Sequence, residues 1–62
     1  MTVKTRKLRW RVLRGADYLD LVEEREGHAP LVFVGLVNGR EAVRTPDRHA
    51  ASKALIAARA DG

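Results

Sequence analysis

The strongest structural constraint in this sequence is an apolar run over residues 31–37 that is followed at once by Asn38-Gly39. An Asn-Gly pair between two strand-like segments is the best short signal for a two-residue type I′ hairpin, because both turn residues need a positive φ. The sequence therefore predicts two antiparallel strands, over residues 31–37 and 40–44. The first of them is apolar on both of its faces.

Two further strands are predicted upstream of this hairpin. Residues 7–13 alternate between apolar and cationic side chains, which is the period of a half-buried strand. Residues 15–17 form a turn, and residues 18–24 then carry the aromatic and branched side chains that suit a second strand. The alternation in the first strand places Leu8, Trp10 and Val12 on one face and Lys7, Arg9 and Arg11 on the other.

The charges of the first two predicted strands are complementary. Residues 1–14 contain cations and no acid, whereas residues 15–30 contain five acids against Arg25 alone. Opposite charges that face each other across a strand pair are stabilising. We therefore expect these two strands to be neighbours, so that part of the basic excess is matched within the chain.

A helix start is predicted after the last strand. Thr45 is the expected N-cap, Pro46 suits the first helical position, and Asp47 favours the positive end of the helix dipole. The helix is expected to run to about residue 60, with Leu55 as the large residue on a stripe of alanines. The fold class is thus α+β: a three- to four-stranded antiparallel meander with one C-terminal helix packed on one face.

Because one helix covers only one face of a sheet, the second apolar row of residues 31–37 is expected to be exposed. Either Phe33 or Val34 should belong to this row, and Ile56 falls on the solvent side of the helix among cations. These three residues are the predicted interface.

The chain has 62 residues and no cysteine, which predicts one domain over residues 1–62 without a disulfide framework or a thiolate metal site. Residues 1–5 are expected to form a flexible basic arm. No apolar run reaches the roughly 20 residues of a membrane helix. No secretory signal follows the basic start, so we expect a cytoplasmic protein that does not associate with membranes.

Catalysis is not predicted. Ser52 and His49 share a helix side, but no strand-to-helix elbow surrounds the serine. With His28 as the only other histidine, a metal site would have to recruit carboxylates at unremarkable spacing. No glycine loop suited to phosphate is present, and we expect no enzyme activity, no metal and no cofactor.

Nucleic-acid binding is the leading functional hypothesis, because the net charge is +4 and arginine, which grips phosphates with two hydrogen bonds, dominates the cations. Trp10 or Phe33 would add a stacking surface if exposed, although Trp10 shares its face with apolar residues and is expected in the core. The predicted binding residues are Lys7, Arg9, Arg11, His28, Arg40, Arg44, Arg48 and Lys53.

The alternative is a protein-binding module that uses the apolar face of residues 31–37. Its partner would be a second copy of the chain, which gives a homodimer, or a larger enzyme that acts on nucleic acid. Salt discriminates the two hypotheses, because electrostatic binding weakens steeply with salt and apolar binding does not.

The strand at residues 18–22, the Gly-His-Ala-Pro loop at 27–30, the Asn38-Gly39 turn and the alanines of the helix together resemble the double-stranded RNA-binding domain. This resemblance implies binding to duplex RNA, with His28 entering the minor groove. The plan is also similar to the arm-site-binding domains of some phage and transposon integrases, which implies a sheet in the DNA major groove. In size and basic character the chain looks like small phage accessory proteins, including inhibitors of host defence enzymes.

Overall fold

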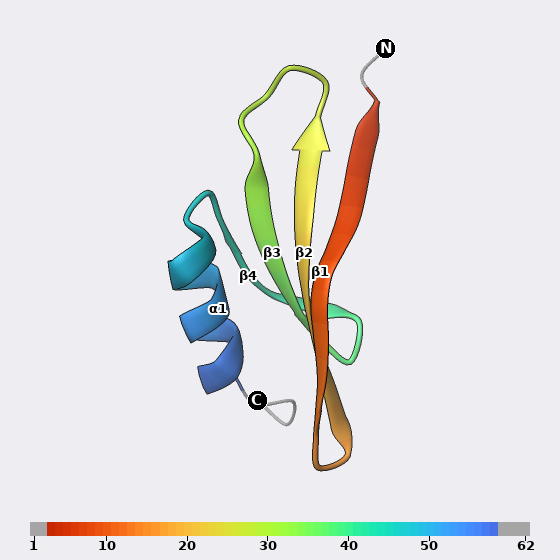
Figure 1. Ribbon diagram of the computed structural model, residues 1–62, viewed down its shortest axis with the longest axis vertical. Helices are drawn as coiled ribbons and strands as arrows, with labels where there is room; N and C mark the ends of the chain where they lie inside the picture. Colours follow the sequence, from red (N-terminus) through yellow and green to blue (C-terminus); the bar gives the residue numbers. More distant parts are fainter. Residues whose placement is uncertain (1–2, 59–62) are drawn as a thin grey trace.

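A computed structural model of the chain describes residues 3–58. It contains the strands β1 (Lys4–Arg14), β2 (Asp17–Glu26), β3 (Val32–Val37) and β4 (Arg40–Thr45), followed by the helix α1 (Arg48–Ala57). The strands form one antiparallel sheet in the order β1-β2-β3-β4, and α1 lies against one face of it (Figure 1). The predicted α+β meander with one C-terminal helix is confirmed.

The sheet begins earlier than the sequence predicts. Lys4 is paired with Glu26, and the carbonyl of Val3 accepts a hydrogen bond from the backbone N–H of Gly27 at 2.9 Å. Residues 3–5 of the expected flexible arm are thus held against β2, because β2 extends to Glu26 and supplies partners for them. Residues 1 and 2 lie outside the described residues.

A one-residue bulge in β1 changes which side chains share a face. Leu8 pairs with Val22 and Trp10 with Leu21, so the backbone of Arg9 has no residue opposite it in the strand register. A bulge reverses the alternation beyond it. Trp10 and Val12 therefore face α1 whereas Leu8 lies on the opposite face, and the prediction that all three share one face was wrong.

The β3–β4 hairpin shows a confirmed turn and an unexpected register. Asn38 and Gly39 have φ values of 53° and 83°, as the predicted type I′ turn requires. Leu36 pairs with Glu41 but Gly35 pairs with Val43, so Ala42 is bulged. Regular pairing from a two-residue turn would place Ala42 opposite Gly35 and Arg44 opposite Phe33, whereas the bulge gives them Val43 and Thr45 as partners.

The helix is capped by Asp47, which corrects the predicted N-cap Thr45. The Asp47 carboxylate accepts hydrogen bonds from the backbone N–H groups of His49 at 3.0 Å and Ala50 at 3.2 Å. Thr45 is still part of β4 and its hydroxyl accepts from the Asp47 N–H at 3.3 Å. The helix ends at Ala57, short of the predicted residue 60, because the backbone of Ala58 is extended.

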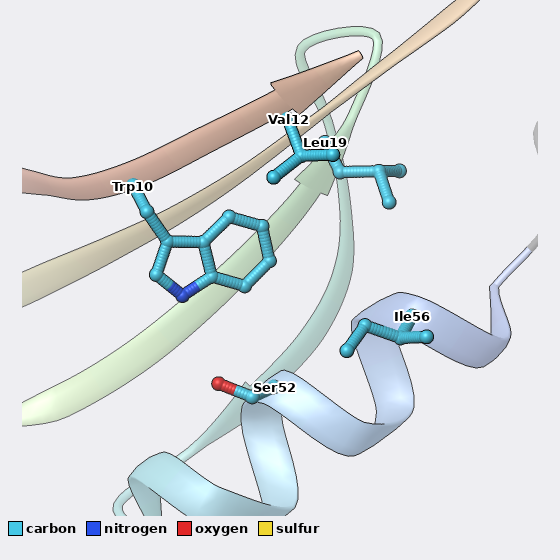
Figure 2. A pocket seen from close by; sticks show the side chains of 5 residues that line it. All are labelled: Trp10, Val12, Leu19, Ser52 and Ile56. Carbon is cyan, nitrogen blue, oxygen red and sulfur yellow. The ribbon is translucent and has the colours of Figure 1, made fainter. Parts of the chain in front are cut away.

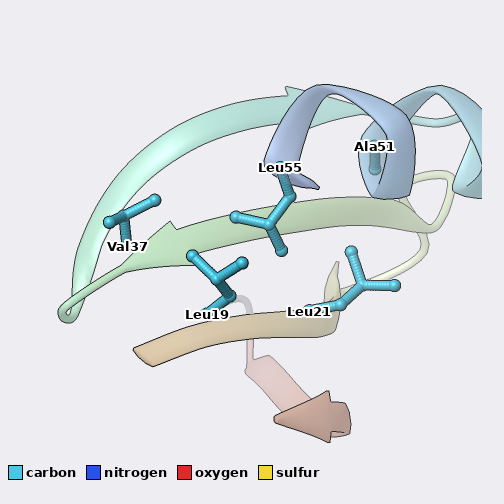
Figure 3. Close-up of a cluster of buried hydrophobic side chains, with 5 residues drawn as sticks. All are labelled: Leu19, Leu21, Val37, Ala51 and Leu55. Atoms are coloured by element: carbon cyan, nitrogen blue, oxygen red, sulfur yellow. The ribbon is translucent and has the colours of Figure 1, made fainter. Parts of the chain in front are cut away.

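The main core lies between α1 and the sheet. Leu55 and Ala51 of the helix meet Leu19, Leu21 and Val37 of the sheet (Figure 3). Gly35 allows this approach, because a Cβ there would lie 2.5 Å from Val43 Cγ1 and 3.1 Å from Leu55 Cβ. The helix rests on β2, β3 and β4 and leaves the adjoining part of β1 uncovered.

Within residues 3–58, no helix has both the length and the apolar character needed to cross a membrane.

We call the sheet face that carries Trp10, Leu21 and Gly35 the helix face, and the face that carries Leu8, Val22 and Val34 the open face. The helix face and α1 together are called the helix side.

Candidate nucleic-acid interface

The apolar row that was expected to be exposed is buried. Val22, Val34 and Leu36 form a second apolar cluster on the open face, and Val34 has an exposed fraction of 0% although no helix covers it. Phe33 lies half-buried on the helix face, and Ile56 is 60% exposed on α1. The three predicted interface residues therefore do not form one surface, and the prediction that the second apolar row of residues 31–37 is exposed was wrong.

Glu24 organises the side chains that cover this second cluster. Its Oε2 accepts hydrogen bonds from Arg6 Nη2 at 2.6 Å and Nε at 3.1 Å, and its Oε1 accepts from Arg44 Nη1 at 2.8 Å. Lys4 Nζ lies 3.4 Å from the same Oε1. Arg44 pairs with Val34 in the strand register, so its side chain must cross β3 to reach Glu24 on β2. Its aliphatic stem thereby covers the apolar row.

The electrostatics of Glu24 follow from these contacts. The hydrogen bonds from Arg6 and then from Arg44 lower the pKa of its carboxyl to about 2, although burial of the carboxylate opposes this. Glu24 is only 3% exposed, and its charge is compensated by three cations. This cluster is a structural ion-pair network that closes the open face.

A second network closes the other end of the open face. Arg11 donates to Asp20 Oδ1 from Nε at 2.6 Å and to Oδ2 from Nη2 at 3.0 Å, and its guanidinium lies 5.4 Å from the centre of the Tyr18 ring. The hydrogen bond to Asp20 raises the pKa of Arg11. Arg44 in the first network also binds Glu41, and this hydrogen bond lowers the pKa of Glu41. Two predicted nucleic-acid residues, Arg11 and Arg44, are thus already engaged with acids.

Among the residues that the structure describes, the excess positive charge lies on the helix side. On the open face the charges balance, with Lys4, Arg6, Arg11 and Arg44 against Asp20, Glu24, Glu26 and Glu41. Arg9 belongs to the helix side because its guanidinium lies 3.4 Å from the carboxylate of Glu23. The helix side holds Lys7, Arg9, Arg14, Arg25, Arg40, Arg48 and Lys53 against Asp17, Glu23 and Asp47, which leaves an excess of four.

The remaining predicted residues are spread over the molecule. Lys7, Glu23, Phe33 and Thr45 form one row of the sheet, so Lys7 lies at the level where α1 begins. Arg48 is exposed in the first turn of that helix. His28 lies in the β2–β3 loop at one end of the molecule, and Arg40 follows the β3–β4 turn toward the other end (Figure 1). The structure does not bring His28 or Arg40 to Lys7 and Arg48.

An apolar groove runs between β1 and α1. Trp10, Val12 and Leu19 of the sheet and Ser52 and Ile56 of the helix line a space of about 380 Å³ (Figure 2). Trp10, which was predicted in the core, is half-buried: it packs against the main core and also lines the groove.

Comparisons with known protein families, with curated proteins and with solved structures find no match for this chain. The resemblances to RNA- and DNA-binding domains remain predictions.

Arg14 is a structural residue that the sequence reasoning did not single out. Its guanidinium donates to the carbonyl of Ile56 at 2.5 Å and to that of Ala58. Ile56 lies in the last turn of the helix and Ala58 is its C-cap residue, so both carbonyls lie where the helix supplies no partner, and the cation satisfies them and complements the helix dipole. Among residues 3–58, no three His, Cys, Asp or Glu side chains are grouped to hold a metal ion.

Proposed function

We propose that this chain is a non-enzymatic module that binds nucleic acid through its helix side. The observation that carries the proposal is the partition of charge within residues 3–58: the open face is neutral, and the helix side holds the excess of positive charge. A surface with an excess of cations attracts polyphosphate and releases its counterions. The proposal keeps the cytoplasmic location that the sequence predicts.

The cations of the helix side are also available for phosphates. Lys7, Arg25, Arg40, Arg48 and Lys53 make no ion pair with any residue between 3 and 58, and all five are exposed. Contacts from these side chains to phosphate therefore break no existing pair. By contrast, a phosphate on the open face would have to compete with Glu24 and Asp20 for their arginines.

The test compares two lysines of the same strand on opposite faces of the sheet. Lys7→Gln removes one charge from the helix side, and Lys4→Gln removes one charge from the open face. Binding of a fluorescent nucleic acid is titrated against salt for both variants and for the wild type. We expect Lys7→Gln to reduce the slope of log affinity against log salt by about one and Lys4→Gln to leave it nearly unchanged.

Because both variants have the same net charge, a general electrostatic effect would change both slopes equally. An equal loss in the two would place the contact elsewhere on the molecule. A wild-type protein that binds no nucleic acid at low salt would overturn the proposed function.

A further inference from the structure

We infer that the groove between β1 and α1 holds an unstacked base of single-stranded nucleic acid against the ring of Trp10, with the adjoining phosphates on the cations at its rim. This inference rests on the proposed function and adds the class of nucleic acid to it. It draws on three features of the groove: the position of the indole ring, the character of the walls, and the charge at the rim.

The bulge at Arg9 determines where the indole ring lies. With strict alternation from Leu8, which is on the open face, Trp10 would also lie on the open face, among the ion pairs. The extra residue turns it to the helix face, where its ring extends from β1 over the sheet toward Ser52 of the helix (Figure 2). The helix does not cover β1, so the ring contacts the core on one side and the groove on the other.

The walls of the groove suit a flat, mainly apolar group. Val12 and Ile56 are 49% and 60% exposed beside it, which leaves their apolar surface to an occupant. The volume of about 380 Å³ falls at the small end of the range for small-molecule sites, about 300–1,000 Å³. The polar groups in this lining are the indole N–H of Trp10 and the hydroxyl of Ser52, and the hydroxyl can both donate to and accept from the edge of a base.

Cations of β1 and α1 precede the groove residues along both elements and favour an anionic occupant. Lys7 and Arg9 precede Trp10 on β1 and belong to the helix side, and Arg9 is held by only one contact, 3.4 Å from Glu23. Arg48 lies one turn before Ser52, so it extends the same side of α1. An occupant that combines a planar apolar face with a regularly spaced negative charge meets both requirements, and a nucleotide strand has this chemistry.

The groove favours a single strand over a duplex. In a duplex each base is stacked on its neighbours, so a protein reaches only base edges and backbone unless it extrudes a base. A single strand offers the faces of its bases, and stacking on an aromatic ring tolerates any sequence. The broad sheet face that no helix covers, and on which a duplex would lie, is the neutral open face, which lacks the excess charge that such binding needs.

Trp10 is the only tryptophan of the chain, so its fluorescence reports on the groove directly. The wild-type protein is titrated at one fixed ionic strength with an oligothymidylate of about 15 nucleotides, with a duplex of the same length, and with polyglutamate. We expect saturable quenching by the single strand, at least about tenfold weaker binding of the duplex, and no quenching by polyglutamate.

Variants separate stacking from simple filling of the groove. Because the Trp10 variants contain no tryptophan, binding of the variants is measured with a fluorescently labelled oligothymidylate. Trp10→Leu keeps an apolar side chain and is expected to weaken single-strand binding about tenfold, whereas Trp10→Phe should retain most of it. Phe33→Leu is the matched control, since Phe33 is a half-buried aromatic residue of the same face that does not line the groove. We expect it to bind as the wild type does. Circular dichroism establishes that each variant is folded, and the wild-type titration needs no variant.

The outcomes distinguish this inference from the proposed function. If duplex and single strand bind equally and Trp10 is not quenched, nucleic-acid binding stands and the base site is overturned. Equal effects of Trp10→Leu and Phe33→Leu would also overturn it. Quenching by polyglutamate would show that the groove takes an acidic polypeptide, and absence of any nucleic-acid binding would overturn both proposals.

Discussion

The two faces of the sheet cover the same kind of apolar surface by different means. On the helix face, Leu55 and Ala51 pack on the leucines of β2 and on β3. On the open face, no helix is present among the described residues, and the stems of arginines tied to buried carboxylates cover Val34 and Val22. Apolar burial thus closes one face, and an ion-pair network closes the other.

This difference separates two roles that basic residues have in one small chain. The cations that pair with Glu24 and Asp20 stabilise the fold, and the two carboxylates neutralise part of their positive charge. The cations on the helix side outnumber the acids there, so this side has a positive electrostatic potential toward solvent. The number of arginines in a strand therefore says little about binding until the acids of the next strand are placed.

The largest effect is expected from breaking the helix-face core. Leu55→Ala should lower the free energy of unfolding by about 2–5 kcal/mol, because Leu55 is fully buried and truncation leaves a cavity. Ile56→Ala, one residue further and exposed, should change it by less than about 0.5 kcal/mol. Urea unfolding measures both, and similar losses for the two would contradict the position of the helix.

The second prediction concerns the closeness of α1 to the sheet. Gly35→Ala places a Cβ 2.5 Å from Val43 Cγ1 and 3.1 Å from Leu55 Cβ, so the Val43 side chain, and with it β4 or the helix, must shift. We expect a loss of about 1–3 kcal/mol from overpacking. Thermal unfolding measures the change, and a variant at least as stable as the wild type would show that α1 lies farther from β3.

The third prediction concerns the open face, whose stability should depend on pH. The folded-state pKa of Glu24 is about 2, below its ordinary value near 4.5, so the unfolded chain binds the proton more readily. The contribution of Glu24 is therefore complete above about pH 4.5 and is lost as the pH falls toward 2. Glu41, whose pKa is also lowered, acts in the same direction.

Glu24→Gln should remove much of this dependence. We expect a lower melting temperature than the wild type at pH 7 and a smaller further decline between pH 4.5 and pH 2. Melting curves of both proteins across this range measure the difference. A wild-type melting temperature that does not change from pH 4.5 to 2 would contradict the network.

The sequence predicts the elements of this fold well because each has a local signal. The Asn38-Gly39 turn and the complementary charges of β1 and β2 are both realised, as the Arg6–Glu24 and Arg11–Asp20 pairs show. The faces are less predictable. The bulges at Arg9 and Ala42 depend on how partner strands fit together, and no single residue indicates them.

Those two bulges account for most of the errors in the predicted site. The bulge in β1 separates Arg9 from Arg11, and the bulge in β4 sends Arg44 to the open face, where Glu24 binds it. The groove was missed because it depends on the offset of α1 from β1, a property of packing. The one sequence signal was Ile56, an apolar residue on the solvent side of the helix.

The smallest effects are expected from substitutions of Arg9 and Arg11, which lie on opposite sides of the sheet. Strict alternation would make Arg9→Gln and Arg11→Gln equivalent, but the bulge places one on each side of the sheet. Arg11→Gln removes both hydrogen bonds to the buried carboxylate of Asp20, so it should lower the melting temperature and leave nucleic-acid affinity unchanged. Arg9→Gln breaks only a single 3.4 Å contact, so it should leave the melting temperature unchanged and lower the salt slope of binding by about one. Melting curves and salt-titrated binding on the two proteins, which have equal net charge, measure both effects, and an interchange of the two results would place the bulge elsewhere in β1.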